Sequence, residues 1–511
     1  MDGYKVDHRR QYKETTELIF ANYTPRSTRR NYTDKVVFAG AQYFVKEILI
    51  RAWNENFFQR PIEDVVNEFN VRINNYLGPN NIGDQHIRDL HALGYLPLII
   101  MALPEGTEYK IKIPSLVIWN TDKRFYWLTN YLETILSTMV WGMCTSATTA
   151  HNYKKLFTKY AMETVGNTDF VQWQGHDFSF RGMFGLEAAC MSGAAHLFSF
   201  TGTDTIPAID FLQEYYNADE TKELIGGSVA ATEHSVACTV ILDFVNKIRI
   251  EKTQLGEQII EDELMNLADI EYVKRLITEI YPTGIVSIVA DSFDYWNTIT
   301  NTARALKDII LNRDGKVVFR PGTGDPVKII CGYTEDDIEN EQIKLSSAEV
   351  KGSVETLWEI FGGTITEKGY KLLDPHVGMI YGDSITYERA YQICEGLKKK
   401  GFASINLVYG IGSFTYQYVT RDTDGYAVKA TYAVIGGEPL EIYKSPKGAA
   451  FKKSAKGLVA VFKDENGEFY LKDGASWEEV LNCEFVKIFE NGKLMKDWTL
   501  QEVRDNLKKY L

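Results

Sequence analysis

The sequence predicts an α/β fold in which an irregular β/α barrel is joined to an α+β domain with an antiparallel sheet formed by N- and C-terminal segments. Between residues 166 and 413, short β-prone runs end in glycine or polar clusters and are followed by stretches long enough for helices. This pattern is typical of parallel β/α units. The flanking segments instead show helical spacing or alternation of apolar and polar residues. The sequence contains no internal repeat of solenoid length, so a solenoid is excluded.

Residues 1–165 are expected to form the α+β layer. Residues 38–77 carry helical spacing, and residues 95–119 are strand-like with turns at the tripeptides PEG and IPS. The segment FYWLTNYLETILSTMVWGM is largely apolar, which predicts a long and mostly buried helix. This layer is expected to pack beside residues 414–511.

Residues 166–413 are expected to form the catalytic barrel. Its seven successive strand ends are HDFSFRG, FSFTGTDT, GGSVAATEHS, IVSIVADSFD, KVVFRPGTG, GMIYGDS and INLVYGIGS. A closed barrel is the simplest arrangement of such units, and an active site in a barrel gathers side chains from the carboxyl ends of several strands. The polar residues of these seven runs stand at those positions.

Residues 414–511 are expected to form the antiparallel C-terminal part. The segments YAVKATYAVI and KGLVAVFKDENGEFYLKDG alternate in polarity, and the tripeptide ENG predicts a hairpin turn. The stretch from Lys444 to Lys456 contains five lysines and no acidic residue, so this loop suits phosphate or pyrophosphate. A solvated surface loop explains the same stretch, because exposed lysines are common.

The composition limits the possible classes of function. The chain has 511 residues, of which 45% are hydrophobic, so it can bury a large core. Its net charge of -13 opposes nucleic-acid binding through bulk charge. The six cysteines form no CxxC pair, which fits a reducing compartment better than a zinc cage or a disulfide framework. The charged N-terminus and the lack of a long apolar run predict a cytoplasmic protein without a membrane segment.

Three strand ends carry candidate binding or catalytic residues. Phe178 and Arg181, three positions apart, can present an aromatic face and a guanidinium to one planar ring. Core packing beside a surface charge is the alternative for this pair. Asp204 either accepts a hydrogen bond from an amide NH2 group or caps a helix. His234, beside Glu233, is either catalytic or structural.

Three glycine-containing turns are candidates for anion binding. RPGTGDP joins Arg320 to a turn whose N–H groups can hold a phosphate. YGDS contains Gly382 and Asp383, and GIGSFTYQYVTRD contains Gly412 and Arg421. Each motif is unspecific alone, because tight turns require glycine. The prediction of anion binding depends on the number of these motifs and on their order along the chain.

Taken together, these segments resemble those of the nicotinamide phosphoribosyltransferase family. Its members are type II phosphoribosyltransferases of NAD salvage. The segments that resemble the family, in the family's order, include HDFSFRG, FTGTDT, SVAATEHS, ADSFD, FRPGTGDP, YGDS, YWLTNYLETIL and EKGYKLL. The resemblance extends from DGYKVDH near the N-terminus to LQEVRDNL near the C-terminus, and so it covers nearly the whole chain.

The resemblance implies a nicotinamide site shared between the two subunits of a homodimer. Phe178 would stack on the nicotinamide ring, and Tyr4 of the other subunit would close the opposite side. Arg181 and Asp204 would address the carboxamide, and a carboxylate there favours the neutral amide over the anionic nicotinate. The further substrate-binding and phosphate-binding positions that it implies are Ser228, Gly382, Gly412, Ser413, Arg26, Arg421, Lys429, Lys444, Lys452 and Lys453.

The resemblance also implies a catalytic group and a reaction. The group consists of His234, Asp294, Arg320 and Asp383. Arg320 and Asp383 would hold the 5′-phosphate and ribose of phosphoribosyl pyrophosphate, and Asp294 would bind ribose or organise Mg2+. His234 would be phosphorylated by ATP, a coupled co-substrate. The resemblance does not identify the residues that would bind the metal ion. The pyridine nitrogen would displace pyrophosphate at the anomeric carbon without a general base, because this nitrogen carries no proton.

Several positions depart from the family pattern. Gly322 stands where the family's RPD motif has an aspartate, and Tyr418 stands where a lysine is usual. Ala290 replaces a serine, and GIGSF replaces GSGGG. Two alternatives therefore stay open: a phosphoribosyltransferase with another acceptor, such as nicotinate, or with shifted donor use, and a catalytically weakened homologue that binds nucleotides or protein partners. Asp204 argues against nicotinate.

Overall fold

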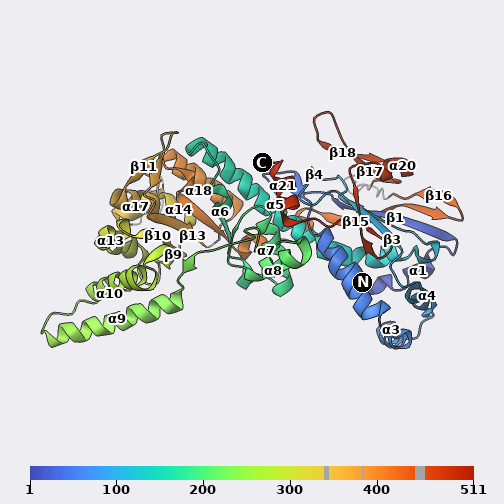
Figure 1. The fold of residues 1–511 in the computed structure, drawn as a ribbon, viewed down its shortest axis with the longest axis horizontal. Helices are drawn as coiled ribbons and strands as arrows, with labels where there is room; N and C mark the ends of the chain where they lie inside the picture. The colour runs from blue at the N-terminus through green and yellow to red at the C-terminus, as the bar shows by residue number, and fades with distance from the viewer. Residues whose placement is uncertain (336, 339–343, 383, 444–454) are drawn as a thin grey trace.

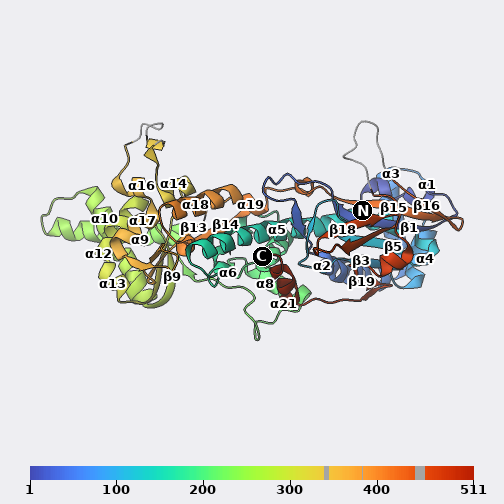
Figure 2. The ribbon, with the colours of Figure 1, turned by 90° about the horizontal axis from the view of Figure 1, so that it is seen from above.

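The computed structural model describes residues 1–335, 337–338, 344–382, 384–443 and 455–511. Two sheets lie toward opposite ends of an elongated molecule, and the long helix α5 (Leu128–Thr164) runs between them (Figure 1). The same separation is visible from above (Figure 2). One sheet is parallel and the other is antiparallel, as predicted.

The parallel sheet contains all seven predicted strands, in the spatial order β7-β6-β14-β13-β10-β9-β8. Every pair of neighbours in it is parallel. Its strands are β6 (Gly175–Asp177), β7 (Gly202–Thr203), β8 (Ala230–Ala231), β9 (Thr283–Val289), β10 (Asp314–Arg320), β13 (Val377–Tyr381) and β14 (Leu407–Ile411). The barrel therefore has the strand composition that the sequence predicts.

The two edges of this sheet meet through main-chain contacts. Gly202 of β7 forms an isolated parallel bridge with Gly227, three residues before β8. The N–H of Gly227 donates to the carbonyl of Thr201 at 2.8 Å, and the N–H of Thr203 donates to the carbonyl of Gly227 at 3.0 Å. The barrel is irregular because β7 and β8 have two residues each, and one isolated bridge completes the ring.

Helices and short turns connect the barrel strands, and α9 and α10 project furthest from them (Figure 1). The main helices of this half are α6 (Val171–Gln174), α7 (Leu186–Leu197), α8 (Ile206–Tyr216), α9 (His234–Gln254), α10 (Glu261–Arg275), α11 (Tyr295–Asn297), α13 (Lys307–Leu311), α14 (Pro326–Cys331), α16 (Ser347–Lys351), α17 (Ser353–Phe361), α18 (Tyr387–Lys399) and α19 (Ser413–Tyr416).

The antiparallel sheet has the order β16-β15-β1-β5-β3-β19-β20. Its central pair joins the two ends of the chain, since β1 aligns with β15 from Thr16 opposite Ile435 to Pro25 opposite Tyr426. The strands are β1 (Thr16–Pro25), β3 (Leu98–Ala102), β5 (Leu116–Asn120), β15 (Tyr426–Ile435), β16 (Glu438–Glu441), β19 (Val486–Glu490) and β20 (Lys493–Leu494). The prediction of a sheet shared by the N- and C-terminal segments is confirmed.

Smaller elements cover this sheet. The predicted ENG turn joins β17 (Val459–Lys463) to β18 (Phe469–Asp473) in an antiparallel hairpin. A further pair consists of β2 (Lys35–Val37) and β4 (Glu108–Lys110). The predicted helical region contains α2 (Ala41–Tyr43) and α3 (Ile62–Leu77), and α4 (Gln85–Leu93), α20 (Trp477–Leu481) and α21 (Leu500–Lys508) complete the main helices of this half.

Helix α5 joins two hydrophobic cores. Its residues from Leu128 to Ala147 belong to the core of the antiparallel half, and those from Ala150 to Ala161 belong to the core of the barrel. A helix of 37 residues extends about 55 Å at about 1.5 Å per residue, which explains how one element serves both cores. Within the described ranges, no helix combines the length and the apolar character that crossing a membrane demands.

Candidate active site

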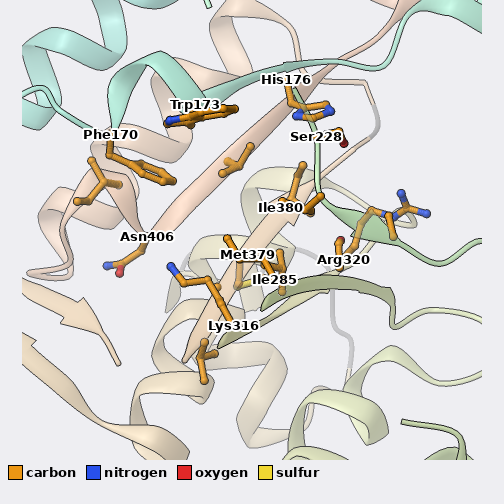
Figure 3. A pocket seen from close by; sticks show the side chains of 18 of the residues that line it. Phe170, Trp173, His176, Ser228, Ile285, Lys316, Arg320, Met379, Ile380 and Asn406 are labelled. Atoms are coloured by element: carbon orange, nitrogen blue, oxygen red, sulfur yellow. The ribbon is translucent and has the colours of Figure 1, made fainter. Parts of the chain in front are cut away.

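A cavity of about 440 Å³ runs through the interior of the barrel. Four residues that the sequence predicted for the site line it, namely Phe178, Asp204, Ser228 and Arg320. Figure 3 shows Ser228, Arg320 and the unpredicted His176 at one end, and Phe170, Lys316 and Asn406 toward the other. Because Arg320 ends strand β10, the predicted residues occupy the end formed by the carboxyl termini of the strands, as expected for a barrel enzyme.

Asp204 presents an ionised carboxylate to this cavity. Its Oδ1 accepts hydrogen bonds from His176 Nε2 at 2.8 Å and from Ser228 Oγ at 2.8 Å. Burial would raise the pKa of Asp204, but the hydrogen bonds from His176 and Ser228 and the charges of His176 and Arg320 outweigh burial and lower the pKa. Within the described chain no hydrogen bond reaches Oδ2, so this oxygen can accept one from a ligand.

Phe178 forms a flat apolar wall beside this carboxylate. The ring lies against the main chain of two strand ends, because a Cβ atom at Gly410 would lie 2.4 Å from Phe178 Cδ2 and one at Gly382 would lie 3.1 Å from Cε2. The ring of His176 is 4.7 Å away between centroids. Any side chain at position 410 would therefore displace the ring. The sequence predicted Phe178 and Gly382 but not Gly410 or His176.

Replacing Gly410 with alanine should raise the KM or Kd for the planar ligand at least about tenfold, the effect of losing an aromatic contact of about 1.5 kcal/mol. The physical cause is displacement of Phe178 by the new methyl group. Gly142→Ala is the matched control, since a Cβ there meets nothing within 4 Å. Equal ligand affinity in the Gly410→Ala and Gly142→Ala proteins would show that Gly410 does not position Phe178.

Arg320 provides the cation of the cavity. Its Nη2 donates a hydrogen bond to the carbonyl of Thr232 at 3.0 Å. Burial lowers the pKa of Arg320, while the charges of Asp204 and Asp291 oppose that effect. Arg181 contributes a second positive charge near Arg320. The site therefore has two cations beside a carboxylate, an arrangement suited to a ligand with phosphate groups and a neutral polar part.

Asp291 pairs with His234, and its charge acts on Arg320 of the barrel cavity. Its Oδ1 accepts a hydrogen bond from His234 Nε2 at 2.9 Å, and its Oδ2 accepts from the N–H of Gly322 at 3.1 Å and from Thr323 Oγ1. Burial would raise the pKa of Asp291, but these hydrogen bonds outweigh it and lower the pKa. A Cβ at position 322 would lie 3.3 Å from Oδ2. An aspartate at position 322 would therefore place a second carboxylate against Asp291, and Gly322 avoids this contact.

The structure distinguishes the two aspartates of the ADSFD segment. Asp294, which the sequence analysis placed in the catalytic group, caps helix α11 by accepting from the N–H of Asn297 at 3.0 Å. It lines a different cavity together with Trp296. Asp291, two residues beyond the end of β9, contacts His234 instead. The structure thus does not bring Asp294 together with the barrel residues.

The remaining predicted barrel residues lie on adjoining turns and at the start of helix α19 (Ser413–Tyr416). A Cβ at Gly182 would lie 2.0 Å from Ser413 Oγ, so the turn that carries Arg181 packs against the predicted Gly412-Ser413 turn. Ser413 is the first residue of α19. Tyr418, one of the departures that the resemblance indicated, stacks on Phe414 with ring centroids 5.6 Å apart and is 82% exposed.

A second group of predicted residues lines a separate cavity of about 430 Å³ in the antiparallel half. It brings together Tyr4, Arg421 and Lys429. Arg26 follows β1 and donates through Nε to the carbonyl of Gly425 at 3.2 Å. Tyr4 is 64% exposed. Tyr4 and Phe178 therefore do not share a cavity within one chain.

Other expectations concern residues or ligands that the structure does not describe. Asp383, Lys444, Lys452 and Lys453 lie outside the described residues. In the part of the chain that is described, no group of three or more His, Cys, Asp and Glu side chains could hold a metal ion. Ala290, the replacement for a serine, is 2% exposed, and its N–H donates to the carbonyl of Arg320 at 3.1 Å.

Comparisons with known proteins identify the family of the chain. Residues 173–479 match the family described as the nicotinate phosphoribosyltransferase (NAPRTase) family. A protein of Acinetobacter baylyi named nicotinamide phosphoribosyltransferase is 46% identical over 523 residues, which cover 100% of this chain and 97% of that protein. A protein with the same name from Mycoplasma pneumoniae is 31% identical over 89% of this chain and 93% of its own length.

Two solved structures share the fold. Nicotinate-nucleotide pyrophosphorylase from Pyrococcus furiosus gives a TM-score of 0.53 at 17% identity and covers 99% of this chain and 93% of that one. Human nicotinic acid phosphoribosyltransferase gives a TM-score of 0.53 at 13% identity, with 100% and 93% covered. The family match over residues 173–479 and the relative that is 46% identical over the whole chain show that the chain belongs to the nicotinate phosphoribosyltransferase family.

Proposed function

We propose that this protein transfers the phosphoribosyl group of phosphoribosyl pyrophosphate to nicotinamide, giving nicotinamide mononucleotide and pyrophosphate in NAD salvage. The observation that carries the proposal is the ionised carboxylate of Asp204 beside the ring of Phe178 in the barrel cavity. The names of the relatives from Acinetobacter baylyi and Mycoplasma pneumoniae support the same acceptor.

The choice of acceptor follows from charge. A carboxamide NH2 group can donate a hydrogen bond to Asp204 Oδ2, whereas the carboxylate of nicotinate would bring a second negative charge against it. Phe178 offers one face for stacking on the pyridine ring. Nicotinate is the competing acceptor, because the family description and both solved relatives carry its name. Asp204 favours nicotinamide.

The transfer itself is a substitution at the anomeric carbon. The lone pair of the pyridine nitrogen forms a bond to C1′, and the C1′–O bond to pyrophosphate breaks with both electrons leaving on pyrophosphate. The nitrogen becomes positively charged, and no proton moves. Arg320 and Arg181 stabilise the growing negative charge of the donor's phosphate groups. Mg2+ enters as part of the donor complex, since this ion is usually held by substrate phosphates and one or two carboxylates.

A product assay tests this function. Purified protein with nicotinamide, phosphoribosyl pyrophosphate and Mg2+ should form nicotinamide mononucleotide and pyrophosphate in equal amounts. Chromatography of the nucleotide and a coupled measurement of pyrophosphate give the two quantities. A lack of product from either acceptor would favour the alternative of a catalytically weakened homologue that binds nucleotides or protein partners.

The proposal includes coupling to ATP through His234. The side chain is 56% exposed and pairs with Asp291, which fixes the ring while leaving it accessible. His234 is also the first residue of α9, where the positive end of the helix dipole favours a bound phosphoryl group. The histidine nitrogen would attack the γ-phosphorus of ATP, and ADP would leave with the electrons of the broken P–O bond.

Replacing His234 with alanine should bring the ratio of rates with and without ATP to about one, while basal transfer continues. His376→Ala is the matched control, because His376 also pairs with an aspartate, Asp374 at 2.7 Å, but lies at the amino end of β13. Initial rates with and without ATP measure the ratio. Full stimulation by ATP in the His234→Ala protein would show that His234 does not couple ATP to the transfer.

The proposal also includes a homodimer that shares its active sites. Tyr4, Arg421 and Lys429 line a cavity of the antiparallel half, and Phe178 lines the barrel cavity of the other half. A second copy that places its antiparallel half against the barrel would complete the ring sandwich and add cations for the pyrophosphate.

The six cysteines are free, which supports action in the reducing environment of the cytoplasm.

A further inference from the structure

A third cavity, of about 540 Å³, lies outside the barrel, between helix α5, helix α21 and the segment that leads into β7. It is separate from the barrel cavity, because α6 contributes Gln172 to one and Trp173 to the other. Three cationic side chains line it, Lys154, Arg504 and Lys508. None of the site residues predicted from the sequence belongs to it.

Among the described residues, the two more buried cations donate hydrogen bonds only to main-chain carbonyls, and the ammonium of Lys154 also lies 5.9 Å from the centroid of the Phe200 ring. Lys154 Nζ donates to the carbonyl of Ser199. The guanidinium of Arg504 donates to the carbonyls of Leu197 at 2.9 Å, Leu224 at 3.1 Å and Ile225 at 2.6 Å. No carboxylate oxygen of the described residues lies within 4.0 Å of a nitrogen of Lys154, Arg504 or Lys508. Carbonyls carry only partial charges, so the positive charge is not neutralised.

The pKa values of Lys154 and Arg504 reflect the lack of a carboxylate partner among the described residues. Burial, together with the charges of Arg504 and Lys508, lowers the pKa of Lys154 to about 8. Burial lowers the pKa of Arg504 to about 10, against the opposing charge of Glu223. Buried cations without a counter-ion are costly, and an anion placed among them would relieve both the repulsion and the loss of solvation.

The rest of the lining shows what kind of anion fits. Phe198, Phe200 and Leu507 form apolar walls, and the carboxylates of Asp169 and Asp505 stand at exposed positions. The lining thus holds three cationic side chains, the two carboxylates of Asp169 and Asp505, and the C-terminal residue Leu511. The volume of about 540 Å³ accommodates a ligand of small-molecule size.

We infer that this cavity is a second anion site, in which Lys154, Arg504 and Lys508 bind a phosphate or pyrophosphate group. Such a group accepts several charge-assisted hydrogen bonds at once, which suits a cavity lined by three cationic side chains from two helices. The site does not depend on the nicotinamide or phosphoribosyl subsites, because no residue of this cluster lines the barrel cavity.

Reactivity of Lys154 toward an acetylating ester tests the inference. At pH 8 and in EDTA, limited acetylation is quantified by mass spectrometry in sodium pyrophosphate and in sodium chloride of equal ionic strength. A bound anion should raise the pKa of Lys154 toward the ordinary lysine value of about 10.4, so acetylation should fall at least about tenfold in pyrophosphate. Acetylation of the exposed Lys159, on the same helix, should be equal in both salts.

A pair of adjacent lysines supplies the matched variants. Lys508→Gln removes a cation that lines the cavity, whereas Lys509→Gln changes the next residue, which does not line it. The pyrophosphate concentration for half-protection should rise at least about threefold in Lys508→Gln and stay unchanged in Lys509→Gln. Equal acetylation of Lys154 in both salts, or the same half-protecting concentration in both variants, overturns the inference.

Discussion

Replacing Asp204 with serine should lower kcat/KM for nicotinamide by about 10- to 100-fold, which corresponds to loss of a charge-assisted hydrogen bond of about 1.5 to 3 kcal/mol. The same change should raise the relative use of nicotinate. Serine removes the negative charge that repels the nicotinate carboxylate, and its hydroxyl can donate to that carboxylate. The acceptor preference, measured as the ratio of the two kcat/KM values, should therefore move toward nicotinate.

The control for this change is an aspartate outside the cavity. Asp210 lies on the neighbouring helix α8 and is exposed, so Asp210→Ser should leave the ratio unchanged. Thermal unfolding of both variants separates lost recognition from lost folding. If the acceptor ratio of Asp204→Ser equals that of the parent protein, the carboxylate does not select the acceptor.

A heterodimer built from two defective chains should recover activity. Asp204→Ser damages the barrel half, and Arg421→Ala removes a cation from the antiparallel half, so each variant alone should lose about 10-fold or more. In a shared-site dimer of one chain of each kind, one site receives both damaged halves and the other receives neither. The purified heterodimer should therefore show about half of the parent activity.

Two affinity tags on co-expressed chains allow the heterodimer to be isolated. The parent dimer carrying the same two tags controls for the purification. If each site were built within one chain, both sites of the heterodimer would be damaged and activity would stay near that of the separate variants. That outcome would contradict the shared site, although it would leave the nicotinamide assignment intact.

The barrel could be predicted from the sequence because each of its strands ends in a recognisable change of residue type. Even β7 and β8, with two residues each, were found through the polar clusters that follow them. The location of Asp204 and Arg320 in the barrel cavity was predictable for the same reason, since they stand at strand ends where a barrel places its site. The completion of the ring by Gly202 and Gly227 depends on long-range main-chain contacts, which no local pattern reveals.

The residues that sequence reasoning missed act through tertiary contacts. Gly410 supports Phe178 from another strand, and His176 holds the Asp204 carboxylate across 28 positions. Asp291 carried a usable signal, because it lies two residues after β9 whereas Asp294 lies five residues after it. Proximity to the strand end therefore favours Asp291. The role of Gly322 was not predictable, since it depends on an N–H that points at Asp291.

The most direct measurement of acceptor choice places nicotinamide and nicotinate in one reaction at equal concentration, with limiting phosphoribosyl pyrophosphate and Mg2+. Mass spectrometry separates the two mononucleotides, which differ in the carboxamide and carboxylate groups. A negatively charged side chain facing the ring substituent predicts that nicotinamide mononucleotide predominates. A predominance of nicotinate mononucleotide would contradict that prediction and with it the proposed acceptor.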